Sequence, residues 1–597
     1  MTNTITTRFS PLLIDWCDGL VAHQLASPAC AVGGLFCPAC QIVHGRCGDA
    51  VYTLLAAFAA TGREEYRESA LALFDWSEEH ATLPDGSWRN EVTGWPWRGI
   101  TCFSLIALGE ALRLHGDKLE PADAAKWRER LRRGADFLME FMTRDTGNIN
   151  YPLSTAASLA SAWRVLGDQR YKERAHELAN LAADYLTPEG FIWGEGDRGQ
   201  NDWSGRRLRA IDLCYNAAET LPNLALYAHL TGDTEIATLV TRSFRTHLAF
   251  LLPDGGWDAG WSTRQCKWVY WGSRTSDGVA SGLMLLAESA PEFADAAERN
   301  LSQLAACTHD GLLYGGPHAA RHGLKPCIHH TIVSARGLAS ALHAAASVDG
   351  DPALVASQRQ PDGARMWHDI ATAQVAVGDW RSSVTAYDFP YLGTLQHHPS
   401  GGALTMLWHA STGPLAVASM NNYNPVEPVN MAAPRLDDDM LPLTPRVQVI
   451  WKGVKYSNIY NGNAALTHGA DGSETTISAT GILRDEHGEP CPEPATYTLT
   501  YRYSPSQFSM TALVTGEGCA ELIFPVVSPA SDTMTETENG TDIAKPGATV
   551  KIRGGANLPA PGPRIYNHVP GVEAIPFALP LVSGEAGTIK LEVQQED

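Results

Sequence analysis

A repeating pattern over roughly the first 345 residues limits the fold more than any other feature of the chain. Three segments align: "YTLLAAFAATGREEYRESALALFDW" from residue 52, "LASAWRVLGDQRYKERAHELANLAADYL" from 159 and "LPNLALYAHLTGDTEIATLVTRSFRTHLAFL" from 221. In each, apolar residues recur at spacings of three and four, and a glycine (Gly62, Gly167 or Gly232) interrupts the pattern. Each segment is therefore predicted to form two helices, with the glycine as the left-handed end of the first.

A loop with a turn signal follows each predicted hairpin: "LPDGSW" at residue 83, "TPEGFIW" at 187, "LPDGGW" at 252 and "HDGLLYGG" at 309. Asp-Gly between apolar residues is typical of β-hairpins. The first helices are expected to begin near residues 47, 97, 150, 215, 272 and 329. Six helical hairpins at this long period, each closed by a short β-hairpin, predict an (α/α)6 toroid over residues 1–346, since a tetratricopeptide-like solenoid has a shorter and stricter period.

Beyond about residue 380 the pattern changes to short β-rich runs, such as "RVQVIWKGVKYSNIY", "ATYTLTYRYS" and "AELIFPVV", which Gly, Pro and Asn separate. We expect an antiparallel β-sandwich over residues 381–597, and a linker with a helical segment over 347–380. The 597 residues are enough for two or three separate cores.

Charge and hydropathy restrict the partners. The formal net charge of −21 argues against nucleic-acid binding, although arginines gathered in one groove could still bind an anionic polymer. No run of about eighteen apolar residues is present, so we expect no membrane span. The N-terminal sequence lacks the basic and apolar regions of a signal peptide. We therefore expect a cytoplasmic protein, or a secreted or periplasmic one whose signal was removed.

The starts of the inner helices are the expected binding site. In a toroid these N-termini gather at one end of the barrel, where free N–H groups and helix dipoles favour an anionic ligand. The expected substrate contacts are His44, Arg46, Trp97, Arg98, Asn150, Tyr151, Tyr215, Arg274, His329 and His330. Each alone would be an ordinary residue at a helix start, but together they favour an anionic sugar polymer.

The stretch "CPACQIVHGRCGD", residues 37–49, has a second interpretation. Cys37, Cys40, His44 and Cys47, with Cys30 as a fifth candidate, lie at spacings that could bind zinc. A closed zinc site usually takes its ligands from two knuckles, and the chain has no second Cys-x-x-Cys. Since "HGRCGD" is the first inner-helix start, we favour buried thiols without zinc, with a metal site as the alternative.

Two enzyme classes suit a toroid with a sugar-binding cleft. A glycoside hydrolase needs two carboxylates across the scissile bond, for which Asp277 and Glu219 are candidates. A polysaccharide lyase neutralises a uronate carboxylate with Asn, Arg or His, while Tyr or His removes the C5 proton and protonates the leaving oxygen. A non-catalytic glycan-binding protein would need only the aromatic and arginine side chains.

Two consecutive helix starts, "IDLCYNAAETLPNL" and "LPDGGWDAGWSTRQCKWVYWGSRTSDG", resemble those of the toroid lyases that include alginate lyases and heparinase II/III-like enzymes. In that group an Asn opens one inner helix, and the next repeat carries an Asp-Gly turn, an Arg and a catalytic Tyr. The resemblance assigns these roles to Asn216, Asp254 with Gly255, Arg264 and Tyr270. Taken singly, Asn216 could be a helix cap and Tyr270 a packing aromatic.

The group usually supplies a His from the start of its sheet domain, and "QHHPSGGALTMLWHAS" offers His397, His398 and His409, of which His398 is slightly favoured. Singly, the first two could be loop residues, and His409 could simply end a strand. Several relatives have His beside the Asn, where this chain has Tyr215 and Ala217. The resemblance therefore leaves neutralisation to Asn216 with Arg264, and the base is Tyr270 or a sheet-domain His.

The pattern is most similar to polysaccharide lyase family 35. This likeness implies β-elimination of a glycosaminoglycan (hyaluronan, chondroitin sulfate or heparan sulfate) to 4,5-unsaturated uronate products. No cofactor is expected to be required, although the sheet domains of related lyases can hold a structural divalent cation. The oligomeric state is left open.

Overall fold

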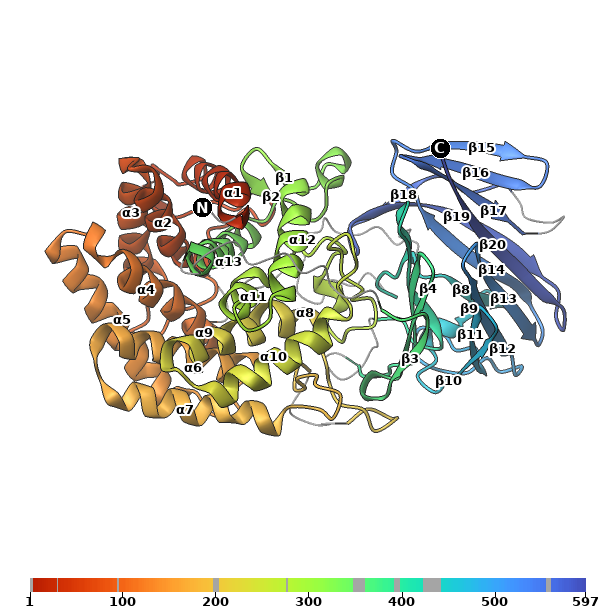
Figure 1. Cartoon of the computed structure of the whole chain (residues 1–597), viewed down its shortest axis with the longest axis horizontal. Helices are drawn as coiled ribbons and strands as arrows, with labels where there is room; N and C mark the ends of the chain where they lie inside the picture. Colours follow the sequence, from red (N-terminus) through yellow and green to blue (C-terminus); the bar gives the residue numbers. More distant parts are fainter. Residues whose placement is uncertain are drawn as a thin grey trace. The chain divides into compact units, whose positions relative to one another are not determined.

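The computed structural model describes residues 4–28, 31–93, 96–196, 203–274, 278–346, 360–390, 398–421, 442–554 and 560–596. The chain divides into two compact units. Unit 1 comprises Met1–Arg198, Leu213–Leu251 and Trp271–Ser357 and is helical, whereas unit 2 comprises Gly199–Asp212, Leu252–Tyr270 and Gln358–Asp597 and is built of strands (Figure 1). None of the described helices is both long and apolar enough to cross a membrane.

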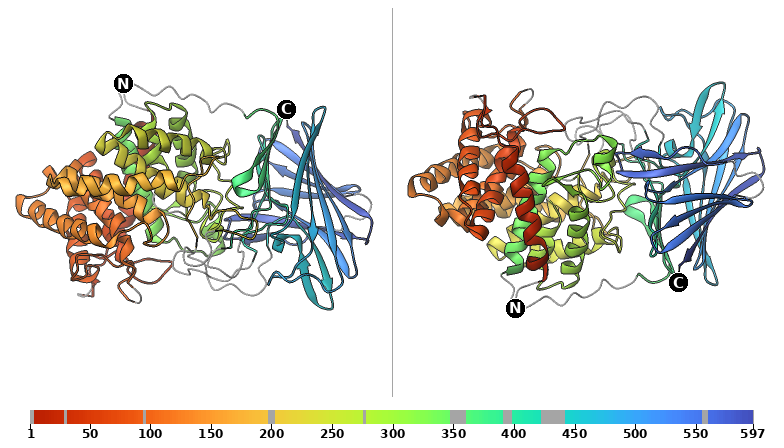
Figure 2. Two further views of the ribbon diagram at one scale, coloured as in Figure 1. Left: turned by 90° about the horizontal axis from the view of Figure 1, so that it is seen from below. Right: turned by 90° about the horizontal axis from the view of Figure 1, so that it is seen from above.

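Unit 1 is a closed ring of helical hairpins. Its inner helices are α2 (Val51–Thr61), α4 (Thr101–His115), α6 (Asn150–Leu166), α9 (Leu221–Thr231), α11 (Ala280–Leu286) and α13 (Ile328–Ala346). Each contacts the next, and α13 contacts α2. The outer helices are α3 (Glu64–His80), α5 (Pro121–Phe141), α7 (Gln169–Asp184), α10 (Thr234–Leu248), α12 (Glu292–Ala306) and α1 (Thr4–Ala22). The first helix of the chain, α1, packs on the last, α13, and so completes the ring (Figure 2). The predicted toroid is confirmed.

The helix ends follow the sequence signals. Gly62, Gly167 and Gly232 end α2, α6 and α9 with φ of 71°, 77° and 76°, the left-handed region that favours glycine. The outer helix α10 buries Ile236, Val240 and Phe244, which lie four residues apart on one face. Inner helix α9 is buried over nearly its whole surface, as a helix inside the ring must be.

Short connections lie between the hairpins. Bridges join Thr82 to Trp88 and Leu186 to Ile192, and β1 (Thr308–His309) pairs with β2 (Leu312–Leu313). The inner helices α2 and α4 follow the 3-10 turns η2 (Gly45–Ala50) and η3 (Arg98–Ile100). Before α9 lie the short α8 (Leu213–Tyr215) and the π-helical segment η5 (Asn216–Thr220).

Unit 2 contains three antiparallel sheets. One is a meander of β3 (Gly363–Trp367), β4 (Thr372–Val377), β5 (Trp380–Thr385), β6 (Ala403–His409) and β7 (Gly413–Val417). The largest has the order β10 (Ala465–Asp471), β11 (Glu474–Ile482), β12 (Thr496–Ser504), β13 (Gln507–Thr515), β20 (Ala586–Gln595), β17 (Ala548–Arg553), β16 (Gly540–Lys545) and β15 (Thr533–Thr537). The third has the order β18 (Ile565–Asn567), β19 (Val572–Leu581), β14 (Cys519–Val527), β8 (Arg446–Trp451) and β9 (Val454–Ser457).

The three sheets share one core. Trp380 and Leu407 from the meander, Tyr501 and Phe508 from the largest sheet, and Phe524 from the third belong to a single buried cluster. In β12 buried and less buried residues alternate, as expected of a strand with one face on a core. The sandwich predicted for the second half of the chain is confirmed.

The boundary between the domains differs from the expectation. Strands β3 and β4 and the start of β5 lie within the segment predicted as a linker with a helix, 347–380, so strands begin at Gly363 rather than after 380. Residues 347–359 lie outside the described part of the chain. The run "TAQVAV" of β4 fits helical and strand patterns alike, and all six of its residues are buried, so tertiary packing decides its conformation.

Two segments that fall within the predicted toroid, Gly199–Asp212 and Leu252–Tyr270, belong instead to the β unit. They carry no helical period, and hydrogen bonds attach them to unit 2. The backbone N–H of Ile211 donates to the Tyr387 hydroxyl at 2.8 Å, and Ser383 Oγ donates to the Asp258 carboxylate. Tyr270, expected before an inner helix, is therefore a residue of unit 2.

Candidate functional site

Unit 1 buries a group of amide and carboxylate side chains at the starts of two inner helices, here called the amide cluster: Asn150, Glu195, Asn216 and Glu219. Asn150 begins α6; its backbone N–H donates to Glu195 at 3.0 Å and its Nδ2 donates to Glu219. Asn216 begins η5, and its Nδ2 donates to the Ile192 carbonyl at 2.6 Å. The cluster thus joins the starts of α6 and η5 to residues 192–195, which follow α7.

The environment of Asn216 leaves part of its amide available. A backbone carbonyl only accepts hydrogen bonds, so Ile192 fixes which end of the amide is nitrogen, and a second N–H remains on Nδ2. Oδ1 of Asn216 and Oδ1 of Asn150 are buried and have no hydrogen-bond partner among the described residues. A π-helical segment such as η5, which begins at Asn216, often occurs at a functional site.

Glu219, a candidate for a hydrolase carboxylate pair, lies in the amide cluster and accepts the hydrogen bond from Asn150. Its suggested partner, Asp277, lies outside the described residues. The structure therefore gives Glu219 an amide partner and does not bear on the carboxylate pair.

Unit 2 holds a second group, here called the tyrosine cluster: the buried Tyr270 and Trp408 and the half-buried Asp254. The Tyr270 hydroxyl donates to the Asp254 carboxylate at 2.6 Å, and Trp408 Nε1 donates to the same oxygen at 2.9 Å. Asp254 lies in the "LPDGGW" turn and Trp408 on β6. A Cβ on Gly256 would lie 2.1 Å from Tyr270 Cζ, so the ring needs glycine beside it.

The tyrosine cluster determines the protonation of Tyr270. Burial and then the negative charge of Asp254 raise the pKa of Tyr270 well above 10. The hydroxyl therefore retains its proton at neutral pH, which favours a proton donor over a base. Tyr270 and Asp254 were predicted from the sequence, but Trp408 comes from the sheet domain and no local pattern indicates it.

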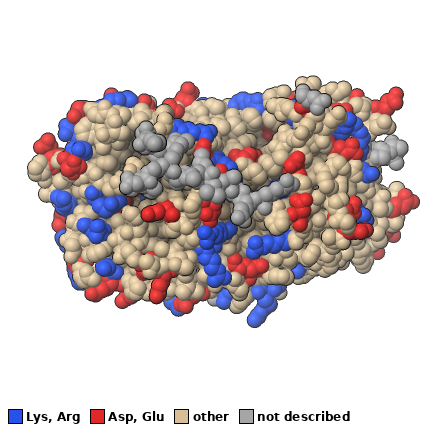
Figure 3. All heavy atoms as spheres, in the orientation of Figure 1, with Lys and Arg blue, Asp and Glu red and all other residues tan. Residues whose placement is uncertain are grey.

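The expected arginines differ in their surroundings. Arg46 is buried, pairs with Asp49 at 2.8 Å and lies over the Phe103 ring, whereas Arg98 is exposed and pairs with Asp85 at 2.8 Å. Arg264 and Arg274 are both buried. Since carboxylates neutralise Arg46 and Arg98, the part of the groove expected in unit 1 carries less free positive charge than the sequence suggested. Acidic and basic side chains are interspersed over the face shown in Figure 3.

The sheet-domain histidines are held by the backbone. His398 is fully buried, with Nδ1 3.1 Å from the Pro399 carbonyl and Nε2 2.9 Å from the Phe389 carbonyl. Carbonyls only accept, so both ring nitrogens are placed to donate, and neither is placed to take a proton. His409 Nδ1 accepts the N–H of Ser411 at 3.2 Å. His397 lies outside the described residues.

The other expected contacts in unit 1 include two groups of neighbouring rings. Trp97 meets Tyr151 edge to face with ring centroids 5.2 Å apart, and both are half-buried. His329 lies 6.2 Å from His44 and 6.0 Å from His330 between ring centroids. Burial, and then the positive charge of Arg46, hold the pKa of His329 well below 6.5. Tyr215 ends α8, directly before Asn216, and is half-buried.

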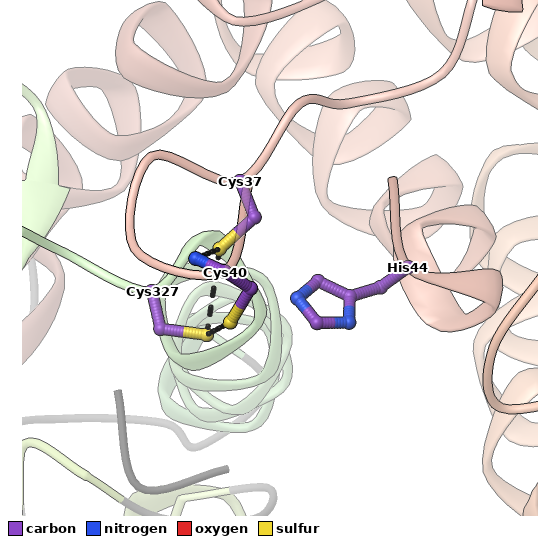
Figure 4. A group of neighbouring side chains, drawn as sticks. All are labelled: Cys37, Cys40, His44 and Cys327. Atoms are coloured by element: carbon purple, nitrogen blue, oxygen red, sulfur yellow. Dashed lines mark hydrogen bonds between the residues drawn. The ribbon is translucent and has the colours of Figure 1, made fainter. Parts of the chain in front are cut away.

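The thiols of the opening motif meet a cysteine from the other end of unit 1 (Figure 4). Cys37, Cys40, His44 and Cys327 have ligand atoms that all lie within 4.8 Å of one another, and we call them the thiol cluster. Cys47, grouped with these residues from the sequence, is not a member, and Cys30 lies outside the described residues. Spacing could not identify Cys327, because it lies 290 residues after Cys37.

One ring nitrogen of His44, Nε2, faces the three sulfur atoms of the thiol cluster, and the other, Nδ1, faces a carboxylate. Nδ1 lies 3.0 Å from Glu91 Oε1, and Nε2 is buried without a hydrogen bond of ordinary geometry to any described residue. Burial alone would lower the pKa of His44, but contacts with the Cys37 and Cys40 thiols and with Glu91 raise it to about 12. Contacts with the Cys327 and Cys40 thiols hold the pKa of Cys37 well below its usual range. The cluster therefore favours a thiolate.

Asp258 is a further buried acid in unit 2, and no sequence motif indicated it. It is 2% exposed, and its contact with Ser383 only partly offsets the effect of burial, which raises its pKa to about 7. Between pH 3.8 and about 7 the folded state holds a proton that the unfolded state has lost. The contribution of this proton to the free energy of unfolding is therefore fully present below pH 3.8. It decreases as pH rises above 3.8 and is lost once pH has risen through about 7.

Asp258→Asn should therefore stabilise the protein increasingly as pH rises. Asn keeps the oxygen that accepts from Ser383 and carries no charge. A shift of about three pKa units corresponds to roughly 4 kcal/mol at pH 8. The measurement is the difference in Tm between variant and wild type from pH 4 to pH 8. Asp471→Asn, at an exposed position on β10, is the control and should show no such trend. A difference that stays constant with pH would contradict the prediction.

Comparisons with known proteins agree with the two-unit layout. Residues 13–359 match the family model described as the ulvan lyase N-terminal domain, and residues 364–595 match the ulvan lyase C-terminal domain. A broad-specificity ulvan lyase of Formosa agariphila is 34% identical over 585 residues, which cover 96% of this chain and 91% of that protein.

Solved structures of polysaccharide lyases share the fold. Chondroitin AC lyase of Streptomyces coelicolor, in complex with chondroitin sulphate, matches with a TM-score of 0.54 and 13% identity over 99% of this chain and 80% of its own. A heparan sulfate lyase mutant from Pedobacter heparinus matches with a TM-score of 0.51 and 11% identity over 100% and 86%. These likenesses concern the fold alone, and they confirm the expected toroid followed by a β domain.

Proposed function

This chain belongs to the ulvan lyase family, and we propose that its substrate is ulvan, a sulfated polysaccharide that contains uronic acid. It is a polysaccharide lyase. The observation that carries the choice of substrate is its 34% identity to a broad-specificity ulvan lyase over nearly the whole of both chains. The glycosaminoglycans suggested by the sequence remain the competing substrates.

We propose cleavage by β-elimination at a uronic acid. The C5–H bond breaks and its proton passes to a base, the C4–O bond to the next sugar breaks, and a C4–C5 double bond forms. The leaving oxygen takes up a proton. The uronate carboxylate gains negative charge as C5 loses its proton, so a hydrogen-bond donor at that carboxylate accelerates the reaction.

Two residues have the chemistry for separate parts of this reaction. Tyr270 is our proposed donor of the proton to the leaving oxygen, because burial and Asp254 keep its hydroxyl protonated at neutral pH. Asn216 is our proposed donor to the uronate carboxylate, because Ile192 fixes its amide and leaves one N–H available. The amide of Asn216 is neutral, so it adds no charge to the amide cluster, which already contains Glu195 and Glu219.

The test of the substrate is an absorbance assay. The purified protein is incubated separately with ulvan, hyaluronan, chondroitin sulfate, heparan sulfate and alginate, and ultraviolet absorbance is followed, because only elimination creates a conjugated double bond. We expect a rapid rise with ulvan and a much slower rise, or none, with the other four. A protein that eliminates a glycosaminoglycan faster than ulvan would overturn the proposed substrate, and new reducing ends without absorbance would overturn elimination.

A further inference from the structure

We propose that Cys37, Cys40, His44 and Cys327 bind a structural zinc ion that fastens the first repeat of the toroid to the last. Cys37 and Cys40 belong to the loop before α2, His44 directly precedes η2, and Cys327 directly precedes α13. The inference concerns stability and is independent of the proposed substrate.

The sulfur geometry is that of a tetrahedral centre. Zn–S bonds of ~2.3 Å at tetrahedral angles place the sulfur atoms about 3.8 Å apart. The Sγ atom of Cys327 lies 3.7 Å from that of Cys37 and 3.8 Å from that of Cys40. Sulfur atoms in van der Waals contact reach similar separations, so the assignment depends on the fourth ligand atom, from His44, which lies within 4.8 Å of all three sulfur atoms.

The fourth ligand completes the set. Figure 4 shows the His44 ring directed at the three sulfur atoms. Its Nε2 is buried without an ordinary hydrogen bond to any residue in the described part of the chain, while Nδ1 contacts the Glu91 carboxylate at 3.0 Å. A metal-bound histidine typically donates its other N–H to a carboxylate, which orients the ring and raises its basicity. Backbone pairing between His44 and Glu91 holds this carboxylate in place.

The backbone around the first two thiols also suits a metal. The N–H of Cys40 points at Cys37 Sγ at 3.4 Å, a contact that stabilises a thiolate. Gln41, the next residue, has φ of 58°, a conformation that costs a non-glycine residue roughly 1–2 kcal/mol. A tight turn that brings Cys37 and Cys40 to one ion explains why this strain is retained. Three sulfur ligands with one imidazole in tetrahedral geometry favour zinc over the other common divalent metals.

The position of the cluster explains what the ion would do. The ring of unit 1 closes where α13 meets α2, and Cys327 is separated from Cys37 by 290 residues. A link between distant parts of a chain restricts the unfolded state more than a local one does, and binding to the folded state alone adds the binding free energy to stability.

The test begins with metal analysis of full-length protein purified without chelators. We expect one zinc per chain, and removal of zinc by a strong chelator should lower Tm by roughly 5–10 °C. Cobalt added to the zinc-free protein should give the visible absorption of a tetrahedral thiolate site. Zinc-free wild type that binds neither zinc nor cobalt, or a disulfide between two of these cysteines in its place, would overturn the proposal.

Variants then assign the ligands. Cys327→Ser should lose zinc, whereas Cys47→Ala, which removes a buried thiol outside the cluster, should retain it. Because Cys327→Ser could fail to fold, Glu91→Gln offers a milder test: it keeps all four ligands and should weaken zinc binding about 10–100-fold. The assignment would be refuted if Cys327→Ser retained its full zinc content. It would also be refuted if Glu91→Gln bound zinc with unchanged affinity while Cys47→Ala lost it.

Discussion

Tyr270→Phe should lower kcat for elimination by about 10²–10⁴-fold, the usual effect of losing one proton-transfer group. The substitution deletes only a hydroxyl, and Asp254 keeps its hydrogen bond from Trp408, so the tyrosine cluster should remain folded. KM should change little, because the transferred proton matters in the transition state and not in the bound ground state. The measurement is initial rate against substrate concentration, followed by ultraviolet absorbance.

Tyr501→Phe is a matched control in the same unit. Tyr501 is also fully buried and its hydroxyl also makes one short hydrogen bond, to the Gly402 carbonyl at 2.7 Å. Loss of that bond should destabilise unit 2 by about 1–3 kcal/mol and leave kcat nearly unchanged. If Tyr270→Phe turns over as fast as Tyr501→Phe, Tyr270 does not transfer a proton in this reaction.

The toroid was predictable because its determinants are local. The period of the apolar residues, the glycines that end α2, α6 and α9, and the Asp-Gly turns all act within a few residues, and each appears in the structure where expected. The order of the largest sheet was not predictable, because β13 pairs with β20 and β20 with β17. Such pairings join segments far apart in the chain, and alternation within a strand does not specify its neighbour.

In the candidate site, too, the residues with local sequence signals were predictable and those brought in by tertiary packing were not. Asn216 and Tyr270 could be picked out because each lies beside a recognisable helix start or turn. Their partners could not: Trp408 reaches Asp254 from β6, and Ile192 reaches Asn216 from a preceding turn. The thiol cluster is the clearest case, since the spacing of Cys37, Cys40, His44 and Cys47 suggested the wrong fourth residue. Closure of the ring brings Cys327 there instead, and no local spacing encodes that closure.

Asn216→Ala should lower kcat by about 10²–10³-fold, the usual effect of losing one donor to a developing negative charge. Its second N–H, which Ile192 leaves available, is the group that we propose contacts the uronate carboxylate. Asn216→Asp should lower kcat at least as much, because it replaces the donor by a negative charge that repels the substrate. Both variants leave the Ile192 carbonyl without its donor, at a cost of about 1–3 kcal/mol in stability.

Asn223→Ala separates that structural cost from the chemical effect. Asn223 lies on α9, two turns after Asn216; it is also buried, and its Nδ2 donates to Ser154 Oγ on α6 at 2.8 Å. Its removal should lower Tm about as much as Asn216→Ala does, because each breaks one buried hydrogen bond from an amide. Only Asn216→Ala should also reduce kcat, since only its amide is proposed to meet the carboxylate. Equal kcat values for the two alanine variants would mean that Asn216, like Asn223, only holds the inner helices together.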